Sequence, residues 1–338
     1  MKILVVAPSW IGDTVLAQPL FKLLHARHPG LVLDALAPAW TLPVLRRMPE
    51  VRSTIASPFG HGELKFSGRR RVGRHVRAEH YDQAIVLPNT LKSALVPWFA
   101  GIRRRTGYRG EMRWGVVNDV RRLDELALPQ MAQRFAALAL EAGETLPVPL
   151  PPPQLTVHDR ERLETLAALG LDDTRHAVAL CPGAEYGPAK RWPPAYFAEL
   201  ARSFTQSGEA VWIVGSARDA EIAEDIVRLS GGACLNLCGK TSLDQAIDLL
   251  ASARLVVTND SGLMHVAAAV GAPLLAIYGS STPVFTPPLS PRATVLKLDI
   301  PCSPCFERTC PLGHFNCMMQ LKPEQVFARA LELTSNNG

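Results

Sequence analysis

Short apolar segments alternate with helical stretches along the whole chain, and this alternation most constrains its fold. The first half predicts strands at 3–7, 31–37 and 83–87 and a helix at 14–27. The second half predicts strands at 178–181, 210–214, 255–257 and 274–278, and helices at 194–206, 243–253 and 266–270. Strands separated by helices form parallel sheets that are covered on both faces. We therefore expect an α/β protein with doubly wound, Rossmann-like domains.

A proline-rich segment divides the chain. Residues 145–154 contain five prolines, which neither a helix interior nor a central strand accommodates. Because 338 residues suffice for two domains, we predict an N-terminal domain at 1–150 and a C-terminal domain at 151–338. The second ends in a Cys-rich segment, 302–317, and a C-terminal helix. We expect the two domains to face each other across a cleft at the carboxyl ends of their strands, where such folds bind ligands.

The charge is divided unevenly between the halves. Residues 1–155 hold 21 Lys and Arg against 12 Asp and Glu, a net charge of +9, whereas the remainder holds 15 against 19, or −4. A basic half predicts an anionic partner. The N-terminus enters a strand without a cleavage site, and no apolar run reaches membrane-spanning length. We therefore expect a cytosolic protein whose seven cysteines are thiols or metal ligands.

The loop after the first predicted strand, residues 8–13, lacks the G-x-G-x-x-G pattern of dinucleotide-binding folds. This counts against a dehydrogenase or an NDP-sugar epimerase that binds NAD. Asp13 stands where the next helix begins. Two roles fit a carboxylate there: a helix N-cap, or a general base that faces a ligand.

Three loops of the second half carry the residues of a phosphate or sugar site. Residues 181–192 combine two glycines with Lys190 and Arg191, which suits phosphate contact. Residues 215–221 place carboxylates where they suit ribose hydroxyls. Residues 258–265 turn from a strand into a helix through Asp260, Ser261 and Gly262. The positive end of that helix dipole favours an anion.

These loops together resemble the bacterial ADP-heptose:lipopolysaccharide heptosyltransferases, which are inverting glycosyltransferases with the GT-B fold. The resemblance is carried by PSWIGD at 8–13, PGAE at 182–185 with KRW at 190–192, and NDSGLMH at 259–265. Four further segments are similar to the type II members: FGHGEL at 59–64, LPN at 87–89, KSALVP at 92–97 and TGYRGEMR at 106–113. Type I members, which act on heptose-free Kdo2-lipid A, are the alternative.

The resemblance implies transfer of L-glycero-D-manno-heptose from ADP-heptose to the first heptose of the lipopolysaccharide inner core, with inversion and without a catalytic cofactor. Asp13 is then the general base, and Lys190 meets the charge of the leaving ADP. The implied donor-binding residues are Glu185, Tyr186, Gly187, Lys190, Gly215, Ser216, Asp219, Glu221, Thr258, Asp260, Ser261, Gly262, Leu263 and His265.

The resemblance also gives the basic half a partner. The acceptor is an acidic, lipid-anchored saccharide, so contact with the cytosolic face of the inner membrane is implied to be peripheral. The arginines and lysine implied to meet its phosphates and carboxylates are Arg69, Lys92, Arg109 and Arg113.

Four cysteines fall within sixteen residues near the C-terminus, at Cys302, Cys305, Cys310 and Cys317. They are either free thiols or the ligands of a structural zinc ion, with His314 as a possible replacement; an iron–sulfur cluster or a disulfide is less favoured. A zinc-bearing nucleic-acid module is a third class of function. It is disfavoured because no aromatic residues are interleaved with the basic clusters to form a stacking surface.

Overall fold

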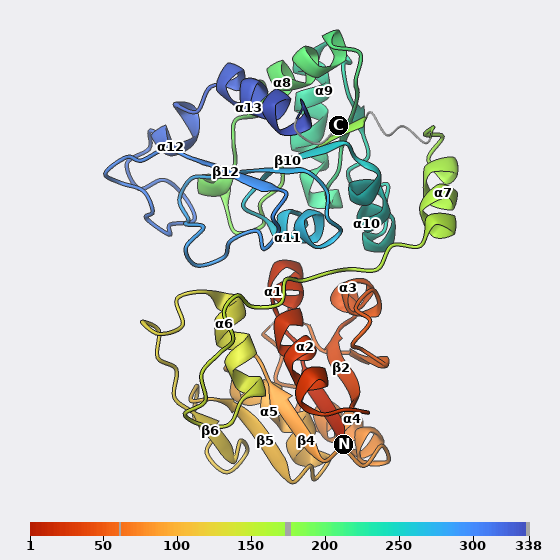
Figure 1. Ribbon diagram of the computed structural model, residues 1–338, viewed down its shortest axis with the longest axis vertical. Helices are drawn as coiled ribbons and strands as arrows, with labels where there is room; N and C mark the ends of the chain where they lie inside the picture. Colours follow the sequence, from red (N-terminus) through yellow and green to blue (C-terminus); the bar gives the residue numbers. More distant parts are fainter. Residues whose placement is uncertain (61, 173–176, 336–338) are drawn as a thin grey trace. The chain divides into compact units, whose positions relative to one another are not determined.

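The computed structural model describes residues 1–60, 62–172 and 177–335, so His61 of the FGHGEL motif lies outside the described residues. The chain divides into two compact units, Met1–Pro153 and Gln154–Gly338 (Figure 1). Each unit contains a six-stranded sheet in which all strand pairs are parallel. The alternation of strands and helices along the chain therefore produces two doubly wound sheets, as predicted.

The sheet of the first unit has the order β3-β2-β1-β4-β5-β6. Its strands are β1 (Lys2–Val6), β2 (Val32–Pro38), β3 (Ser53–Ser57), β4 (Gln83–Val86), β5 (Arg104–Tyr108) and β6 (Asp119–Arg121). Ile3, Leu4 and Val5 of β1 are completely buried, because β1 lies inside the sheet and both of its faces are covered. This double burial explains its uninterrupted apolar sequence.

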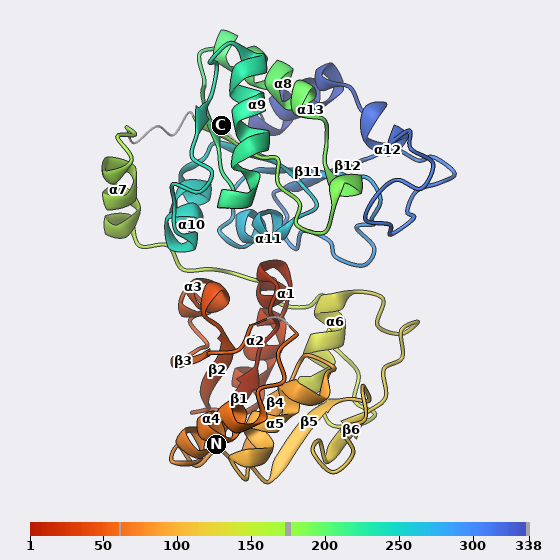
Figure 2. The same ribbon diagram turned by 180° about the vertical axis from the view of Figure 1, so that it is seen from behind.

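Helices cover both faces of this sheet. They are α1 (Ile11–Leu16), α2 (Gln18–Arg27), α3 (Leu42–Arg46), α4 (Phe66–Arg77), α5 (Leu91–Phe99) and α6 (Met131–Ala136). Helices α4 and α5 pack together, and α2 packs with α6. Figure 2, the reverse view, also shows α4 and α5 side by side.

The second sheet has the order β12-β11-β10-β7-β8-β9. Its strands are β7 (Ala177–Cys181), β8 (Ala210–Ile213), β9 (Leu235–Asn236), β10 (Leu255–Asn259), β11 (Leu274–Tyr278) and β12 (Ala293–Lys297). The helices of this unit are α7 (Asp159–Ala168), α8 (Pro194–Gln206), α9 (Ala220–Ser230), α10 (Leu243–Ser252), α11 (Gly262–Ala269), α12 (Asn316–Met319) and α13 (Pro323–Ser335). Residues of α8, α9 and α13 share one hydrophobic core with the sheet.

The predicted helix at 14–27 and the predicted linker at 145–154 have different outcomes in the structure. The predicted helix at 14–27 is wrong as one element: it is divided into α1 and α2 at Ala17. Pro19 explains the break, because proline lacks the N–H that a continuous helix would use. The proline-rich segment 145–154 forms neither helix nor strand. Among the described residues, no helix combines the length and apolarity needed to cross a bilayer.

Candidate functional site

The strand order places the candidate loops. In both sheets the chain runs outward in one direction from the first strand and in the other from the fourth, so the order reverses between β1 and β4 and between β7 and β10. Loops at the carboxyl ends of such strands bind ligands in doubly wound folds. Asp13 follows β1, Lys190 follows β7, and Asp260 follows β10. Each unit therefore carries its predicted polar residues at its own reversal point.

The loop before Asp13 is held by backbone-directed hydrogen bonds. Trp40 Nε1 donates to the Ser9 carbonyl at 2.9 Å, and Thr14 Oγ1 donates to the Trp10 carbonyl at 2.9 Å. Trp10, rather than Asp13, occupies the N-cap position of α1. Asp13 lies in the first turn and is partly buried. The N-cap interpretation of Asp13 is thus wrong, and its role as a base stays a prediction.

A buried ion pair forms the centre of the second unit's site. Lys190 Nζ lies 2.5 Å from Asp260 Oδ2, and Ser281 Oγ donates to the same oxygen at 2.5 Å. The Lys190 ammonium also lies 5.0 Å from the centre of the Tyr186 ring. Asp260 is only 5% exposed. Oδ2 therefore receives both bonds, and the binding of a sugar hydroxyl by this carboxylate stays a prediction.

Asn259 joins the two loops that carry this pair. Its Nδ2 donates to the Pro182 carbonyl at 2.7 Å, and its Oδ1 accepts from the Trp192 amide at 3.0 Å. Trp192 is itself buried, and its Nε1 donates to the Leu321 carbonyl at 2.9 Å. Asn259 therefore sets the distance between the Lys190 loop and the start of α11.

Helix α11 begins where the site needs positive potential. Ser261 is its N-cap residue, with an extended backbone and no side-chain cap, and Gly262 and Leu263 open the helix. The first amides of a helix have no partner within it, so they are available to an anion. Thr258 is buried, and its Oγ1 lies 3.4 Å from Ser261 Oγ.

His265 lies one turn into α11 and is buried. Burial lowers the pKa of its imidazole to about 4, although the Asp260 carboxylate opposes that change. Its Nδ1 has no hydrogen-bond partner among the described residues. His265 is therefore neutral near pH 7, which disfavours a role as a proton donor.

The other predicted donor residues are partly engaged within the loops. Gly187 passes so close to the Arg308 carbonyl that a side chain there would collide. Asp219 Oδ2 accepts from the Ser216 amide at 2.9 Å and from its hydroxyl at 2.7 Å. This carboxylate caps the start of the turn that Gly215 precedes. The Asp219 carboxylate is therefore engaged in capping hydrogen bonds within the turn.

Two predicted residues flank this turn and stay exposed. Glu185 forms an ion pair with Arg218, and Glu221 is exposed in the first turn of α9. Tyr186 is held by a 2.5 Å hydrogen bond from its hydroxyl to the Phe306 carbonyl. Ribose contact by Asp219 and Glu221 stays a prediction.

Two of the four predicted acceptor residues have structural tasks. Arg69 donates to the carbonyls of Leu64, Glu63 and Lys92 at 2.6, 2.8 and 2.9 Å. Arg113 donates to the Pro88 carbonyl at 2.7 Å and also to the Tyr108 carbonyl. Both are buried, and burial lowers the pKa of both guanidinium groups.

Arg69 and Arg113 are therefore engaged by the protein's own carbonyls, and their contact with an anionic acceptor stays a prediction. Arg109 is exposed and Lys92 is partly exposed. Lys92 follows β4, which borders the reversal point, and Arg109 follows β5, the next strand outward; both lie at the same sheet edge as Asp13. They are the more exposed candidates for acceptor contact.

The four cysteines near the C-terminus are partly exposed free thiols. In the described part of the chain, no three His, Cys, Asp or Glu side chains are placed to hold a metal ion. A structural zinc ion at these cysteines is therefore not confirmed. Cys310 is distinctive, because the amide of Phe315 and its neighbours donate to its sulfur and lower its pKa.

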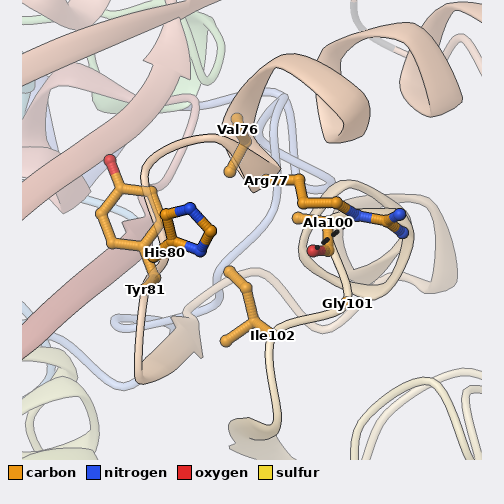
Figure 3. Close-up of a pocket in the computed structure, with 7 residues that line it drawn as sticks. All are labelled: Val76, Arg77, His80, Tyr81, Ala100, Gly101 and Ile102. Carbon is orange, nitrogen blue, oxygen red and sulfur yellow. Dashed lines mark hydrogen bonds between the residues drawn. The ribbon is translucent and has the colours of Figure 1, made fainter.

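A cavity of about 410 Å³ lies elsewhere in the first unit. Its lining residues precede β4 and β5 or end the helices before them: Val76, Arg77, His80, Tyr81, Ala100, Gly101 and Ile102. Figure 3 shows Arg77 reaching the Ala100 carbonyl on one side, with the rings of His80 and Tyr81 on the other. The cavity therefore belongs to the amino edge of the sheet, whereas Asp13 belongs to the carboxyl edge.

Two doubly wound sheets of this topology are the architecture of the GT-B class of nucleotide-sugar glycosyltransferases. The chain belongs to glycosyltransferase family 9 (heptosyltransferase), whose sequence pattern matches residues 69–316. It is therefore a glycosyltransferase, and the predicted family is confirmed.

Individual relatives agree with this assignment. The chain is 47% identical to lipopolysaccharide heptosyltransferase 2 of Escherichia coli K12, over 96% of both chains. It also matches the solved structure of E. coli ADP-heptose LPS heptosyltransferase II with a TM-score of 0.90 and 44% identity, covering 100% of this chain and 99% of the other. Lipopolysaccharide heptosyltransferase 1 of Pseudomonas aeruginosa PAO1 is 30% identical, over 96% of this chain and 92% of its own length.

Proposed function

We propose that the protein transfers L-glycero-D-manno-heptose from ADP-heptose to the first heptose of the lipopolysaccharide inner core. The observation that carries this proposal is the 47% identity with a heptosyltransferase 2 along nearly the whole of both chains. The lower identity with a heptosyltransferase 1, 30%, favours the one-heptose acceptor over the heptose-free one. The reaction belongs to assembly of the lipopolysaccharide core.

Each unit has its own part in the proposed reaction. The first unit binds the acceptor through Arg109 and Lys92, and Asp13 takes the proton from the attacking acceptor hydroxyl. The hydroxyl oxygen bonds to the anomeric carbon as the bond from that carbon to ADP breaks on the opposite face. The configuration inverts, and ADP leaves with the bonding electrons.

The second unit binds the donor. Lys190 and the first amides of α11 meet the negative charge that grows on the ADP phosphates. The Lys190–Asp260 distance of 2.5 Å supports this division, because adjacent side chains can then contact the two parts of the donor: Lys190 the diphosphate, and Asp260 the sugar. The carboxylate accepts hydrogen bonds from heptose hydroxyls, and Lys190 beside it pairs with the phosphates.

The location follows from the substrates. The donor is a water-soluble nucleotide sugar and the acceptor is a glycolipid with acidic groups, so we place the enzyme in the cytoplasm, peripheral to the inner membrane. Attachment is electrostatic in part, in keeping with the net charge of +9 in residues 1–155.

The test is to weigh the product. The protein is incubated with ADP-heptose and with lipopolysaccharide acceptors that carry either no heptose or one. We expect a mass increase of one heptose on the one-heptose acceptor alone. Addition to the heptose-free acceptor would indicate a type I enzyme, and addition to neither would refute heptosyl transfer.

Asp13→Asn tests the base in the same assay. The amide keeps the shape of the side chain but accepts no proton, so kcat should fall by about 10²–10⁴. ADP affinity, measured by calorimetry, should stay unchanged because Lys190 and α11 are intact. Wild-type turnover in this variant would remove Asp13 from the mechanism.

A further inference from the structure

Helix α4 is basic along its whole length. Its twelve residues, FSGRRRVGRHVR, contain five arginines and no carboxylate. Arg69 is buried, and Arg77 donates to the Phe99 and Ala100 carbonyls. The remaining three, Arg70, Arg71 and Arg74, are exposed. In the described part of the chain, no carboxylate forms an ion pair with them.

The nearest carboxylates in sequence are engaged elsewhere. Glu63 pairs with Lys65 at 2.8 Å and also accepts from the Gly60 amide. Glu79, just beyond α4, pairs with Lys2 at 2.6 Å and contacts Arg52. The positive charge of α4 is therefore not neutralised locally, unlike that of the arginines near Asp119 and Glu141.

Exposed aromatic rings border this charge. Helices α4 and α5 approach each other so closely at Gly73 that a Cβ there would lie 2.5 Å from the Cβ of Phe99. The Phe99 ring contacts Phe66 on α4 and Trp98 on α5, with ring centres 4.9 Å apart in each pair. Yet Phe66 is 54% exposed and Trp98 is 42% exposed. The core leaves a large part of each ring in water.

Phe66 and two of the exposed arginines share one side of α4. Phe66, Arg70 and Arg74 are spaced four residues apart, and side chains at this spacing follow one another along a helix face. Arg71 lies next to that line. We name these residues, together with Trp98, the α4–α5 stripe: Phe66, Arg70, Arg71, Arg74 and Trp98.

A bilayer surface matches both components of the stripe. Anionic headgroups attract unpaired arginines near the membrane, and aromatic rings favour the boundary between headgroups and acyl chains. We propose that the α4–α5 stripe docks the protein onto the anionic phospholipid surface of a membrane. This inference rests on the proposed function, in which the acceptor is anchored in that membrane. The occupant that competes with it is the acidic saccharide of the acceptor itself.

The test is sedimentation of the full-length protein with phospholipid vesicles. The vesicles are phosphatidylcholine, either pure or with about 30% phosphatidylglycerol as the anionic lipid. The wild type should bind the anionic vesicles and dissociate from them as the salt concentration is raised, because salt shortens the distance over which charges attract each other. The variant Arg70→Ala/Arg71→Ala/Arg74→Ala should lose binding on the order of 100-fold, since each basic residue near an anionic surface contributes about 1 kcal/mol.

A matched control removes the same charge from the same unit. Arg46, Arg103 and Arg122 are exposed and lie outside the stripe, so Arg46→Ala/Arg103→Ala/Arg122→Ala should retain most of the vesicle binding. A second variant, Phe66→Ser/Trp98→Ser, should lose the part of the binding that survives at high salt. ADP affinity verifies that each variant remains folded.

Turnover on a deacylated, water-soluble acceptor separates this inference from the proposed function. The stripe variants should retain that turnover. Equal loss of vesicle binding in the two arginine triples would mean that net charge, not the stripe, attracts the membrane. Loss of turnover on the soluble acceptor with unchanged vesicle binding would assign the stripe to the saccharide. Absence of wild-type binding to anionic vesicles would overturn the inference directly, whereas heptosyl transfer would stand.

Discussion

Replacing His265 with glutamine should make the second unit more resistant to acid. Burial lowers the pKa of His265 from 6.5 to about 4, so the folded protein holds this imidazole neutral while the unfolded chain takes up the proton first. The stability that comes from the neutral form is complete above the unfolded pKa and is lost as the pH falls through 6.5 toward 4. At pH 4.5 the loss relative to pH 7 is about 2 kcal/mol, which is on the order of 10- to 100-fold in the opening equilibrium.

Hydrogen exchange measured by mass spectrometry is the suitable assay, because it reports the opening of this unit alone. The wild type and His265→Gln are compared at the same pH, so intrinsic exchange rates cancel, in peptides that cover β10 and β11. Altered packing in the variant changes the protection by a factor that does not depend on pH. The protection of the variant divided by that of the wild type should rise on the order of 10- to 100-fold between pH 7 and pH 4.5.

The control is His158→Gln, which changes an exposed histidine of the same unit. It should leave the pH profile of protection unchanged. A ratio for His265→Gln that is constant from pH 7 to pH 4.5 would refute the reasoning. It would mean that His265 is protonated as readily in the folded protein as in the unfolded chain.

Four other substitutions test the rest of the site and the packing of the helices around it. Lys190→Ala should weaken ADP binding in calorimetry by about 1.5–3 kcal/mol, the range for hydrogen bonds to charged groups, and unchanged affinity would place the ammonium away from the phosphates. Arg109→Ala should raise the acceptor KM at constant stability, whereas Arg113→Ala should lower the free energy of unfolding by at least about 2 kcal/mol, because it leaves buried carbonyls unpaired; the reverse pattern would assign Arg113 to the acceptor site. Gly73→Ala should cost about 1–3 kcal/mol in thermal unfolding by separating α4 from α5, and a neutral effect would show that the two helices can admit a methyl group at Gly73.

The sequence predicted the fold where the apolar runs are buried on both faces. The central strands β1, β7, β10 and β11 correspond to predicted segments, because complete burial requires an uninterrupted run of apolar residues. It did not predict edge strands such as β3, whose STIAS sequence is partly exposed. Short, half-exposed strands are specified by pairing with a neighbour rather than by their own composition.

For the site, loop position was predictable but side-chain direction was not. Arg69, Arg70 and Arg71 form one run in the sequence, yet helical geometry turns Arg69 inward and leaves the next two in water. Asn259 and Ser281 were missed as functional residues. Asn259 is the first residue of the recognised NDSGLMH motif, and Ser281 lies in GSST at 279–282, directly after β11. A polar run at the end of a buried strand was the signal that would have found Ser281.

The two hydrogen bonds of Asn259 affect the rate and the entropy of donor binding. Because one side chain fixes both the Pro182 carbonyl and the Trp192 amide, the loop after β7 is already shaped before any nucleotide arrives. Little chain entropy is then left to lose on association. Affinity differences among nucleotides should therefore appear mainly in how long each one stays bound, with association rates that are nearly alike.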